Sequence, residues 1–543
     1  MELAVLVSDP LSEEGLAVLR RDPRIRVDVR TGLSPEQLLQ VIGEYDGLIV
    51  RSQTRVTEEV LEAGKRLKIV GRAGVGVDNI DVPAATRRGI LVVNAPEGNT
   101  IAAAELTFAL LLAVARHVPQ AYVSLVKEKK WDRHSFMGVQ LQGKVLGILG
   151  LGRIGTAVAR RAQAFEMRVL AYDPFVSAER ASELGIDLVD VDTICREADF
   201  ITVHTPLTPQ TRGLINRERI QMMKPTVRLI NCARGGIIDE EALAEALASG
   251  RIAGAALDVF SKEPATDNPL LDLPNVVATP HLGASTREAQ VNVAIDVAED
   301  FLRFVKGEPV RNPVNAPALR PEVAAVLEPY RQLAQRLGRL YATVVGKAYP
   351  GIQVVYRGPI TRYDLRPLTC AVLAGMLEPF LHEEVNLVNA PVLAEERGIR
   401  LAEVREGDGR IAGAAEGGEN GSTITIRVQV DGQVRSVGGT VTTAVPSGNP
   451  VPRLIEIDGY RVDIVSSGYL LLSYHIDQPG IIGQVGTILG RHNINIAYMQ
   501  VGRKASRGGR AVMAMGIDDP VPPEVLQEIS RVPGLEATYL TEW

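Results

Sequence analysis

The chain has 543 residues, which at about 100 to 200 residues per domain provides for about three or four domains. Its formal net charge of −6 supplies no overall positive field for nucleic acid or anionic lipid, so we expect neither nucleic acid nor a membrane as a partner. The three cysteines, Cys195, Cys232 and Cys370, are odd in number, far apart and without CxxC spacing, which argues against a disulfide framework or a zinc site. We therefore expect a soluble, cytoplasmic protein without a bound metal.

Short β-branched runs alternate with helical stretches over residues 1–98. The runs include LAVLVSD, DGLIVRS and ILVVNAP, and Ser12 to Arg20 is one of the helical stretches. Such alternation predicts a parallel sheet covered by helices. A long helical segment, Ile101 to Trp131, comes next. A second alternation of strands and helices then runs to residue 282 and predicts a separate α/β unit. The helix Ser285 to Lys306 and the proline-punctuated stretch EPVRNPVNAPALRP then end a domain near residue 315.

The second half of the chain has a different pattern. Residues 316–455 contain helical stretches followed by the alternating strands TITIRVQV and SVGGTVTT, so we expect an α+β domain with a hairpin. Residues 456–543 show a strand, a helix, two strands, a helix and a strand. This βαββαβ order predicts a ferredoxin-like domain.

The segment Gly150-Leu151-Gly152-Arg153-Ile154-Gly155 follows an apolar strand and opens a helix. Its glycines permit a tight turn and let the backbone approach a pyrophosphate at the helix N-terminus, where free N–H groups favour anions. Asp173 stands at the end of the next strand, where a carboxylate can accept both ribose hydroxyls of NAD and would repel the 2′-phosphate of NADP. The sequence therefore predicts a Rossmann-type domain that binds NAD.

A hydride-transfer enzyme acting on an alcohol needs a base, a partner for that base and a cation for the substrate's anionic group. His281, Glu263 and Arg234 each follow a predicted strand of the second α/β unit, at the sheet edge where open α/β sheets bind ligands. The spacing alone does not select them from seven histidines and many arginines.

The combination of GLGRIG with Asp173, VHTPLT, NCARGG, DVFSKEP and TPHLGAST resembles the D-isomer-specific 2-hydroxyacid dehydrogenases. The segments RSQT, VGRAGVGVDNID and KKWDRHSFMG, together with the tail, make the chain similar to the long members of that family. The resemblance is dense over residues 1–315 and good over 470–543. It implies a flavodoxin-like substrate-binding domain made of residues 1–98 and 283–315, into which an NAD domain, 99–282, is inserted.

The resemblance also implies roles for individual residues. His281 would donate or accept the proton, Glu263 would be its partner, and Arg234 would hold the substrate carboxylate. NAD would be contacted by residues of the second α/β unit, which are Gly150, Gly152, Arg153, Ile154, Gly155, Asp173, Thr205, Cys232, Ala233, Arg234, Asp258, His281 and Gly283. The substrate would be contacted by Arg51, Ser52, Arg72, Gly74, Val75 and Arg133, the last on a segment that we expect near a neighbouring subunit.

The tail segment SYHIDQPGIIGQVGTILGRHNINIAY resembles an ACT domain, a regulatory module that binds small molecules. His475, Asp477 and Asn495 are the residues that the resemblance assigns to an effector, with serine as the expected ligand. The whole resemblance implies NAD-dependent oxidation of D-3-phosphoglycerate to 3-phosphohydroxypyruvate by a homotetramer, as the entry step of L-serine synthesis.

Two other interpretations stay open. One is another D-2-hydroxyacid dehydrogenase, such as a glyoxylate or hydroxypyruvate reductase, which the length of chain beyond residue 315 disfavours. The other is a non-enzymatic, NAD-sensing protein of the corepressor kind. Arginine-bearing substrate loops and the ACT-like tail disfavour this second interpretation.

Overall fold

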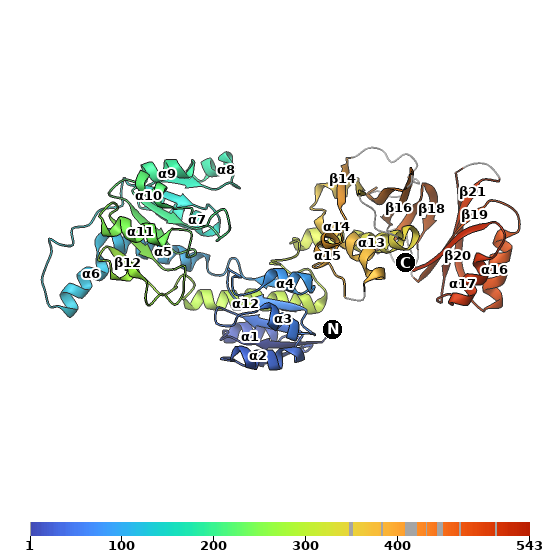
Figure 1. Cartoon of the computed structure of the whole chain (residues 1–543), viewed down its shortest axis with the longest axis horizontal. Coiled ribbons are helices and arrows are strands. Elements are labelled where there is room, and N and C mark those ends of the chain that lie inside the picture. The colour runs from blue at the N-terminus through green and yellow to red at the C-terminus, as the bar shows by residue number, and fades with distance from the viewer. Residues whose placement is uncertain are drawn as a thin grey trace.

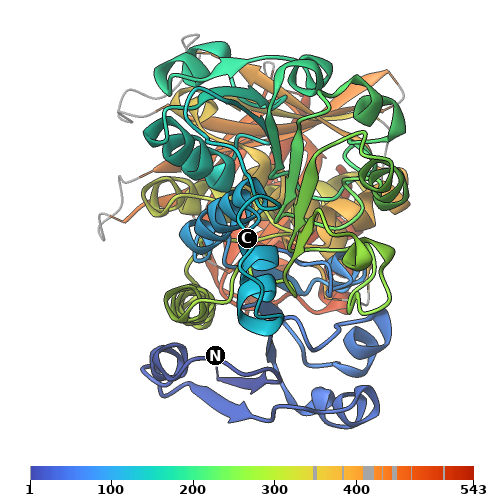
Figure 2. The same ribbon diagram turned by 90° about the vertical axis from the view of Figure 1, so that its left-hand side faces the viewer.

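The structure is a computed structural model, and it describes residues 2–346, 351–381, 384–407, 421–430, 432–442, 449–465, 468–504 and 508–543. Figure 1 shows an elongated chain of four units: an amino-terminal unit, a Rossmann-type unit, a middle unit and a carboxy-terminal unit. Seen along the long axis in Figure 2, the Rossmann-type unit lies in front of the middle and carboxy-terminal units, and the amino-terminal unit lies below.

The amino-terminal unit has a parallel sheet of order β2-β1-β3-β4-β5. Its elements are β1 (Leu3–Val7), α1 (Glu13–Leu19), β2 (Ile25–Val29), α2 (Pro35–Val41), η1 (Ile42–Glu44), β3 (Gly47–Val50), α3 (Glu58–Ala63), β4 (Ile69–Arg72), α4 (Val82–Arg87) and β5 (Leu91–Asn94). This strand order is that of flavodoxin, so the predicted flavodoxin-like fold is confirmed.

Helix α12 (Arg287–Lys306) returns from the second unit to cover this sheet. Its fully buried Phe301 lies against Gly47 of β3 and Gly71 of β4, where an added Cβ would come within 2.8 and 2.7 Å of the ring. The glycines therefore make room for the aromatic ring. The packing explains why a segment far along the sequence belongs to the amino-terminal unit.

The Rossmann-type unit has a parallel sheet of order β12-β11-β10-β9-β6-β7-β8. Its strands are β6 (Val145–Leu149), β7 (Arg168–Tyr172), β8 (Asp187–Leu188), β9 (Phe200–Val203), β10 (Arg228–Asn231), β11 (Gly254–Leu257) and β12 (Val276–Ala278). Its helices include α7 (Arg153–Ala164), α8 (Ala178–Glu183), α9 (Val191–Glu197), α10 (Arg217–Met222), α11 (Glu240–Ala248) and η3 (Pro269–Asp272). The sheet reverses between β6 and β9, as in a Rossmann fold, and the prediction is confirmed.

The predicted long helical segment is divided in the structure. Helix α5 (Thr100–Arg116) is apolar and largely buried against the Rossmann sheet, but it ends at His117, whose φ of 53° is left-handed. Helix α6 (Val118–Tyr122) and the π-helical η2 (Val123–Lys127) continue at an angle of 64°. Among the described residues no single helix is long and apolar enough to cross a membrane, although this bent pair together has the length and composition of a membrane span.

The middle unit has a six-stranded sheet of order β14-β13-β15-β16-β17-β18. Its elements are α13 (Pro321–Val345), β13 (Ile352–Arg357), η4 (Pro359–Arg362), α14 (Arg366–Leu377), η5 (Glu378–Phe380), α15 (Ala390–Glu396), β14 (Leu401–Glu406), β15 (Thr423–Val430), β16 (Gln433–Thr442), β17 (Val451–Ile457) and β18 (Tyr460–Ile464). The antiparallel pair β15 and β16 is the predicted hairpin.

The boundary expected between residues 455 and 456 lies inside this sheet. Strand β17 runs to Ile457, and β18 pairs with it in the register Leu454↔Ile464 and Ile457↔Tyr460. Ile464 is fully buried in the core that includes α13. The middle unit therefore extends to the end of β18.

The carboxy-terminal unit consists of β19 (Tyr469–Ile476), α16 (Ile481–Arg491), β20 (Ile496–Arg503), β21 (Arg510–Ile517), α17 (Pro523–Ser530) and β22 (Leu535–Glu542). The sheet is antiparallel with the order β20-β21-β19-β22, which confirms the ferredoxin-like prediction. One face packs on α16 and α17, and the other, through Leu470, Leu472 and Tyr474, joins the core of the middle unit.

Candidate active site

A cleft of about 1160 Å³ lies between the amino-terminal and Rossmann-type units. Loops that follow parallel strands of both sheets form its walls, as expected for ligand sites in open α/β sheets. The predicted site residues that line it are Arg51, Ser52, Arg72, Gly74, Val75, Ile154, Thr205, Cys232, Ala233, Arg234, Glu263, His281 and Gly283. Residues predicted in the amino-terminal and Rossmann-type units thus meet in one cavity.

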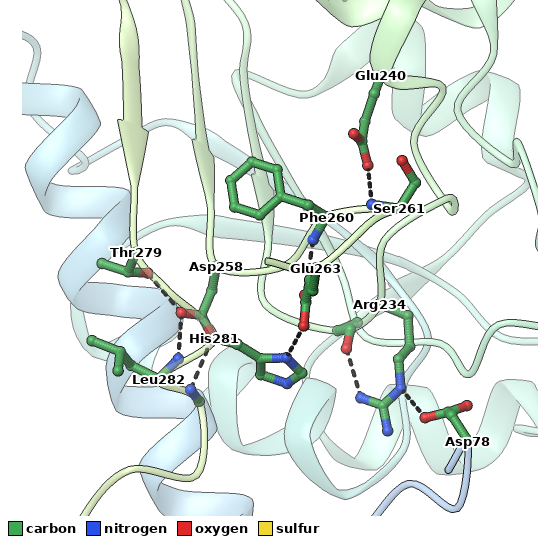
Figure 3. Close-up of polar contacts among 12 residues, drawn as sticks. Asp78, Arg234, Glu240, Asp258, Phe260, Ser261, Glu263, Thr279, His281 and Leu282 are labelled. Carbon is green, nitrogen blue, oxygen red and sulfur yellow. Dashed lines mark hydrogen bonds and ion pairs between the residues drawn. The ribbon is translucent and has the colours of Figure 1, made fainter. Parts of the chain in front are cut away.

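His281 and Glu263 form a hydrogen-bonded pair at the wall of this cleft (Figure 3). His281 follows β12 in a left-handed conformation, with φ of 55°, and its Nδ1 lies 2.8 Å from Glu263 Oε2. The other carboxylate oxygen, Oε1, accepts a hydrogen bond of 3.1 Å from the Phe260 backbone N–H. Because Nδ1 is engaged by the carboxylate, Nε2 is the ring nitrogen that is free to exchange a proton with a substrate.

Asp258 holds the loop that carries the histidine. It is fully buried at the end of β11, and its carboxylate accepts hydrogen bonds from Thr279 Oγ1 at 2.6 Å, from the Leu282 N–H at 2.6 Å and from the Gly283 N–H at 2.8 Å. Both oxygens are thereby engaged within the protein (Figure 3). Asp258 is not among the residues that line the cleft, and its contact with the cofactor stays a prediction.

Arg234 reaches the cleft from the loop after β10. Its Nε donates to Asp78 Oδ2 at 2.9 Å, and its NH1 donates to the Ala233 carbonyl at 2.7 Å (Figure 3). Asp78 belongs to the amino-terminal unit, so this ion pair joins the two walls of the cleft. The NH2 end of the guanidinium also lies close to Gly76, where an added Cβ would fall 1.7 Å from NH2.

Arg72 and Arg51 contribute further positive charge from the amino-terminal unit. Burial, with the nearby Arg234 guanidinium as the second cause, lowers the pKa of Arg72 to about 10. The cleft thus combines Arg234 beside the histidine with two more guanidinium groups, a pattern that suits a substrate with two anionic groups. Arg133 is exposed on the segment after η2 and is not among the residues that line the cleft of this chain.

The glycine-rich turn between β6 and α7 has the geometry of a phosphate-binding loop. Gly150 has φ of 99°, and a Cβ on Gly155 would come within 2.0 Å of the Gly150 carbonyl, so neither position accepts a side chain. A Cβ added to Gly152, by contrast, would meet no other atom within 4 Å, and no side chain caps the start of α7. The N–H groups at this helix end are therefore free for a pyrophosphate.

Two charged side chains flank this turn. Asp173 ends β7, and its Oδ2 accepts a hydrogen bond of 2.8 Å from the Leu151 N–H, which places the carboxylate beside the turn. Arg153, the first residue of α7, pairs at 2.8 Å with Glu97. Neither side chain lines the cleft, as is also true of Gly150, Gly152 and Gly155.

The residues present fit NAD. Thr205 lines the cleft with a buried Oγ1 that has no hydrogen-bond partner in the described part of the chain, so a polar ligand group would satisfy it. Cys232 lies nearby on the same wall, and burial raises the pKa of its thiol to about 12, so it stays protonated and uncharged. Together with the open helix end and Asp173, these groups would receive a dinucleotide.

Asp173 is expected to decide the choice between NAD and NADP. Asp173→Ser removes the negative charge that repels a 2′-phosphate. Phe175→Arg, at an exposed position two residues later, adds a positive charge that attracts it. The two substitutions are combined in one variant. We expect the ratio of kcat/KM for NADP to that for NAD to rise by about tenfold or more. Initial rates with each cofactor measure the ratio, and wild-type protein that uses both cofactors equally would contradict this role of Asp173.

Sequence reasoning missed three polar residues at the cleft. Asp78 and His204 line it, and Asn79 lies directly behind Arg72, to which it is hydrogen-bonded. Burial lowers the pKa of His204 to about 3, so this second histidine stays neutral, with Nε2 3.0 Å from Thr202 Oγ1. The sequence pattern that could have identified Asp78 and Asn79 is their position shortly after the glycine-rich segment Gly74 to Gly76.

Of the predicted effector residues, His475 and Asp477 lie where β19 joins α16, and Asn495 lies directly before β20. His475 is buried near the end of β19, with Nδ1 unpartnered among the described residues, and burial lowers its pKa. Asp477 pairs with Arg503 of β20 at 3.0 Å. Asn495 donates from Nδ2 to Asp518 Oδ2 at 2.7 Å. Asp477 and Asn495 thus have partners that the sequence patterns did not indicate.

Three family models match the chain in order. Residues 108–283 match the NAD binding domain of the D-isomer specific 2-hydroxyacid dehydrogenases, 326–458 match the D-3-phosphoglycerate dehydrogenase intervening domain, and 468–534 match the ACT domain. The matches cover the Rossmann-type, middle and carboxy-terminal units described above.

Similar proteins extend over nearly the whole chain. It is 48% identical to "D-3-phosphoglycerate dehydrogenase" of Synechocystis over 98% of this chain and 94% of that protein. The same name belongs to an Archaeoglobus fulgidus protein that is 48% identical over 99% of this chain and 100% of its own length.

Among solved structures, D-lactate dehydrogenase from Aquifex aeolicus, complexed with NAD and lactic acid, is 30% identical. It has a TM-score of 0.53 and matches 58% of this chain and 100% of its own. From the three successive family matches and the nearly full-length relatives, the chain belongs to the D-3-phosphoglycerate dehydrogenases of the D-isomer-specific 2-hydroxyacid dehydrogenase family.

Proposed function

We propose that the chain oxidises D-3-phosphoglycerate to 3-phosphohydroxypyruvate with NAD, as the entry step of L-serine synthesis. The observation that carries the proposal is the His281–Glu263 pair, which shares one cleft with Arg234, Arg72 and Arg51. The pair provides a base, and the arginines provide cations for a carboxylate and a phosphate. The relatives named D-3-phosphoglycerate dehydrogenase support this choice of substrate.

The residues of the cleft account for binding and proton transfer. NAD, held by the turn at Gly150, by Asp173 and by Thr205, supplies the hydride acceptor when it is bound. Arg234 binds the substrate carboxylate, and His281 Nε2 takes the proton of the C2 hydroxyl. Glu263, 2.8 Å from Nδ1, stabilises the imidazolium that forms.

Initial rates of NADH formation with four substrates test this function. We expect the kcat/KM for D-3-phosphoglycerate to exceed that for D-glycerate, D-lactate and D-2-hydroxyglutarate by about tenfold or more. D-glycerate and D-lactate lack the second anionic group, and D-2-hydroxyglutarate carries a carboxylate in place of the phosphate. A higher value for one of the other three would assign the chain to a different D-2-hydroxyacid. Absence of turnover with all four would favour an NAD-sensing protein without activity.

We further propose that serine is a feedback inhibitor bound at His475, Asp477 and Asn495. Asp477 lies next to the turn that opens α16, so its carboxylate can pair with an ammonium while the helix N-terminus receives a carboxylate. The match to the ACT domain supports this regulation.

Serine titrations of NADH formation decide whether these residues bind the effector. Asp477→Ala and Asn495→Ala are each expected to raise the serine concentration for half-inhibition by about tenfold or more, with uninhibited turnover unchanged. Asp519→Ala, at an exposed carboxylate of the same unit, is the matched control and should behave as wild type. Wild-type inhibition of both variants would place the effector elsewhere.

We also propose a cytoplasmic homotetramer. The three cysteines are buried and free, which suits a reducing compartment. The exposed Trp131 and Arg133 lie on a segment suited to contact a neighbouring subunit. Light scattering coupled to size-exclusion chromatography measures the assembly, and a monomeric mass would contradict this proposal.

A further inference from the structure

The two residues that follow the glycine-rich segment, Asp78 and Asn79, each bind a different arginine of the cleft. Asp78 Oδ2 accepts from Nε of Arg234 at 2.9 Å, and Asn79 Oδ1 accepts from Nε of Arg72 at 2.9 Å. In both arginines the inner nitrogen is therefore engaged within the protein. The terminal nitrogens, of which Arg234 NH1 also donates to the Ala233 carbonyl at 2.7 Å, are the ones that can meet a ligand in the cleft.

Glycines beside the pair let the guanidinium groups lie close to the backbone. A Cβ on Gly74 would come within 2.3 Å of Arg72 NH1, and a Cβ on Gly76 would come within 1.7 Å of Arg234 NH2. A side chain at either position would displace an arginine. Each arginine thus lies close to a glycine of this segment and donates to a side-chain acceptor that follows it, Asn79 for Arg72 and Asp78 for Arg234.

Asn79 also holds the loop that carries Arg51 and Ser52. Its Nδ2 donates to the carbonyls of Arg51 and Thr54, each at 2.7 Å. The buried Asp9 accepts from the backbone N–H groups of Arg51, Gln53 and Thr54 at 2.6 to 3.2 Å. Asn79 and Asp9 together fix the backbone of the loop that carries Arg51 into the cleft.

We propose that Asp78 and Asn79 are positioning residues with separate tasks: Asp78 orients Arg234 toward the substrate carboxylate, and Asn79 orients Arg72 and Arg51 toward the second anionic group. The inference rests on the proposed function, since it assigns the phosphate of D-3-phosphoglycerate to the second group. Asp78 also links the walls of the cleft, because it comes from the amino-terminal unit and Arg234 from the Rossmann-type unit.

The two tasks predict different kinetic results with D-3-phosphoglycerate and D-glycerate, which differ by the phosphate. Asn79→Ala should lower kcat/KM for D-3-phosphoglycerate by about tenfold, through KM, and leave D-glycerate within about twofold of wild type. Asp78→Ala should lower kcat/KM for both substrates by a similar factor of about ten, because both carry the carboxylate. The KM for NAD should not change in either variant.

Conservative and control variants separate positioning from a general loss of structure. Asp78→Asn keeps an acceptor for Nε of Arg234 and should recover most of the activity lost in Asp78→Ala. The Asp78 side chain is 66% exposed, so its truncation removes little packing. Asn292→Ala, at an exposed position of α12 in the same unit, is the matched control and should behave as wild type.

The preference of the wild-type protein for D-3-phosphoglycerate over D-glycerate tests the proposed function. The change of that preference in the variants tests the separate positioning tasks of Asp78 and Asn79. The two can therefore fail separately. An equal loss with both substrates in Asn79→Ala, or wild-type constants in Asp78→Ala, would overturn the assignment of separate tasks.

Discussion

Replacing His281 with alanine is expected to lower kcat by about 100-fold or more, the usual cost of losing a general acid or base. The structure gives His281 a carboxylate partner at 2.8 Å and a place on the cleft wall, whereas the other histidine of the cleft, His204, is neutral because its pKa is lowered to about 3. Because the imidazole acts on the hydroxyl proton, NAD affinity should change little. Steady-state kcat and a fluorescence titration with NADH measure the two effects.

The chain offers a matched control for this substitution. His492, the residue directly after α16, also pairs with a carboxylate, with Nε2 2.9 Å from Glu528 Oε2, but it lies in the carboxy-terminal unit. His492→Ala should therefore retain wild-type kcat in the absence of serine. Near-normal turnover in His281→Ala would remove His281 from the role of base.

Replacing Arg234 with alanine should lower kcat/KM for D-3-phosphoglycerate by about 100-fold, because a charge-assisted, two-pronged contact to the substrate carboxylate is lost. Arg234→Lys keeps the charge without the planar fork and should recover only part of the loss. Initial-rate kinetics at saturating NAD measure both variants.

Arg217 provides the comparison for Arg234. It pairs with Glu245 through two hydrogen bonds on the surface of the same Rossmann-type unit, away from the residues that line the cleft. Arg217→Ala should keep wild-type kinetics. If Arg234→Ala lost no more activity than Arg217→Ala, the substrate carboxylate would have to be bound by another group.

Local patterns predicted most of the fold, since each parallel strand and its covering helix carries its own signal. The turn at Gly150 and the alternation around it were sufficient for the Rossmann-type sheet. Strand β18 was assigned to the wrong unit because Tyr460–Ile464 is short and finds its place only by pairing with β17. The break at His117 was missed because Pro119, which stands in the first turn of α6, was not taken as the start of a new helix.

The candidate site was predicted less completely, because its contacts join distant parts of the sequence. His281, Glu263 and Arg234 were identified through resemblance to a family, and the structure places all three on one cleft. The contacts of Asp78 with Arg234 and of Asp9 with the loop at Arg51 cross units or many residues of chain. Nothing in local periodicity records such pairings.

The most direct test of the account is the fate of the hydrogen on C2 of the substrate. With D-3-phosphoglycerate deuterated at C2 and unlabelled NAD, the account predicts that one deuterium per turnover appears in the NADH, as measured by mass spectrometry. Unlabelled NADH, or formation of NADH without 3-phosphohydroxypyruvate, would contradict the claim that this cleft oxidises the C2 hydroxyl by hydride transfer.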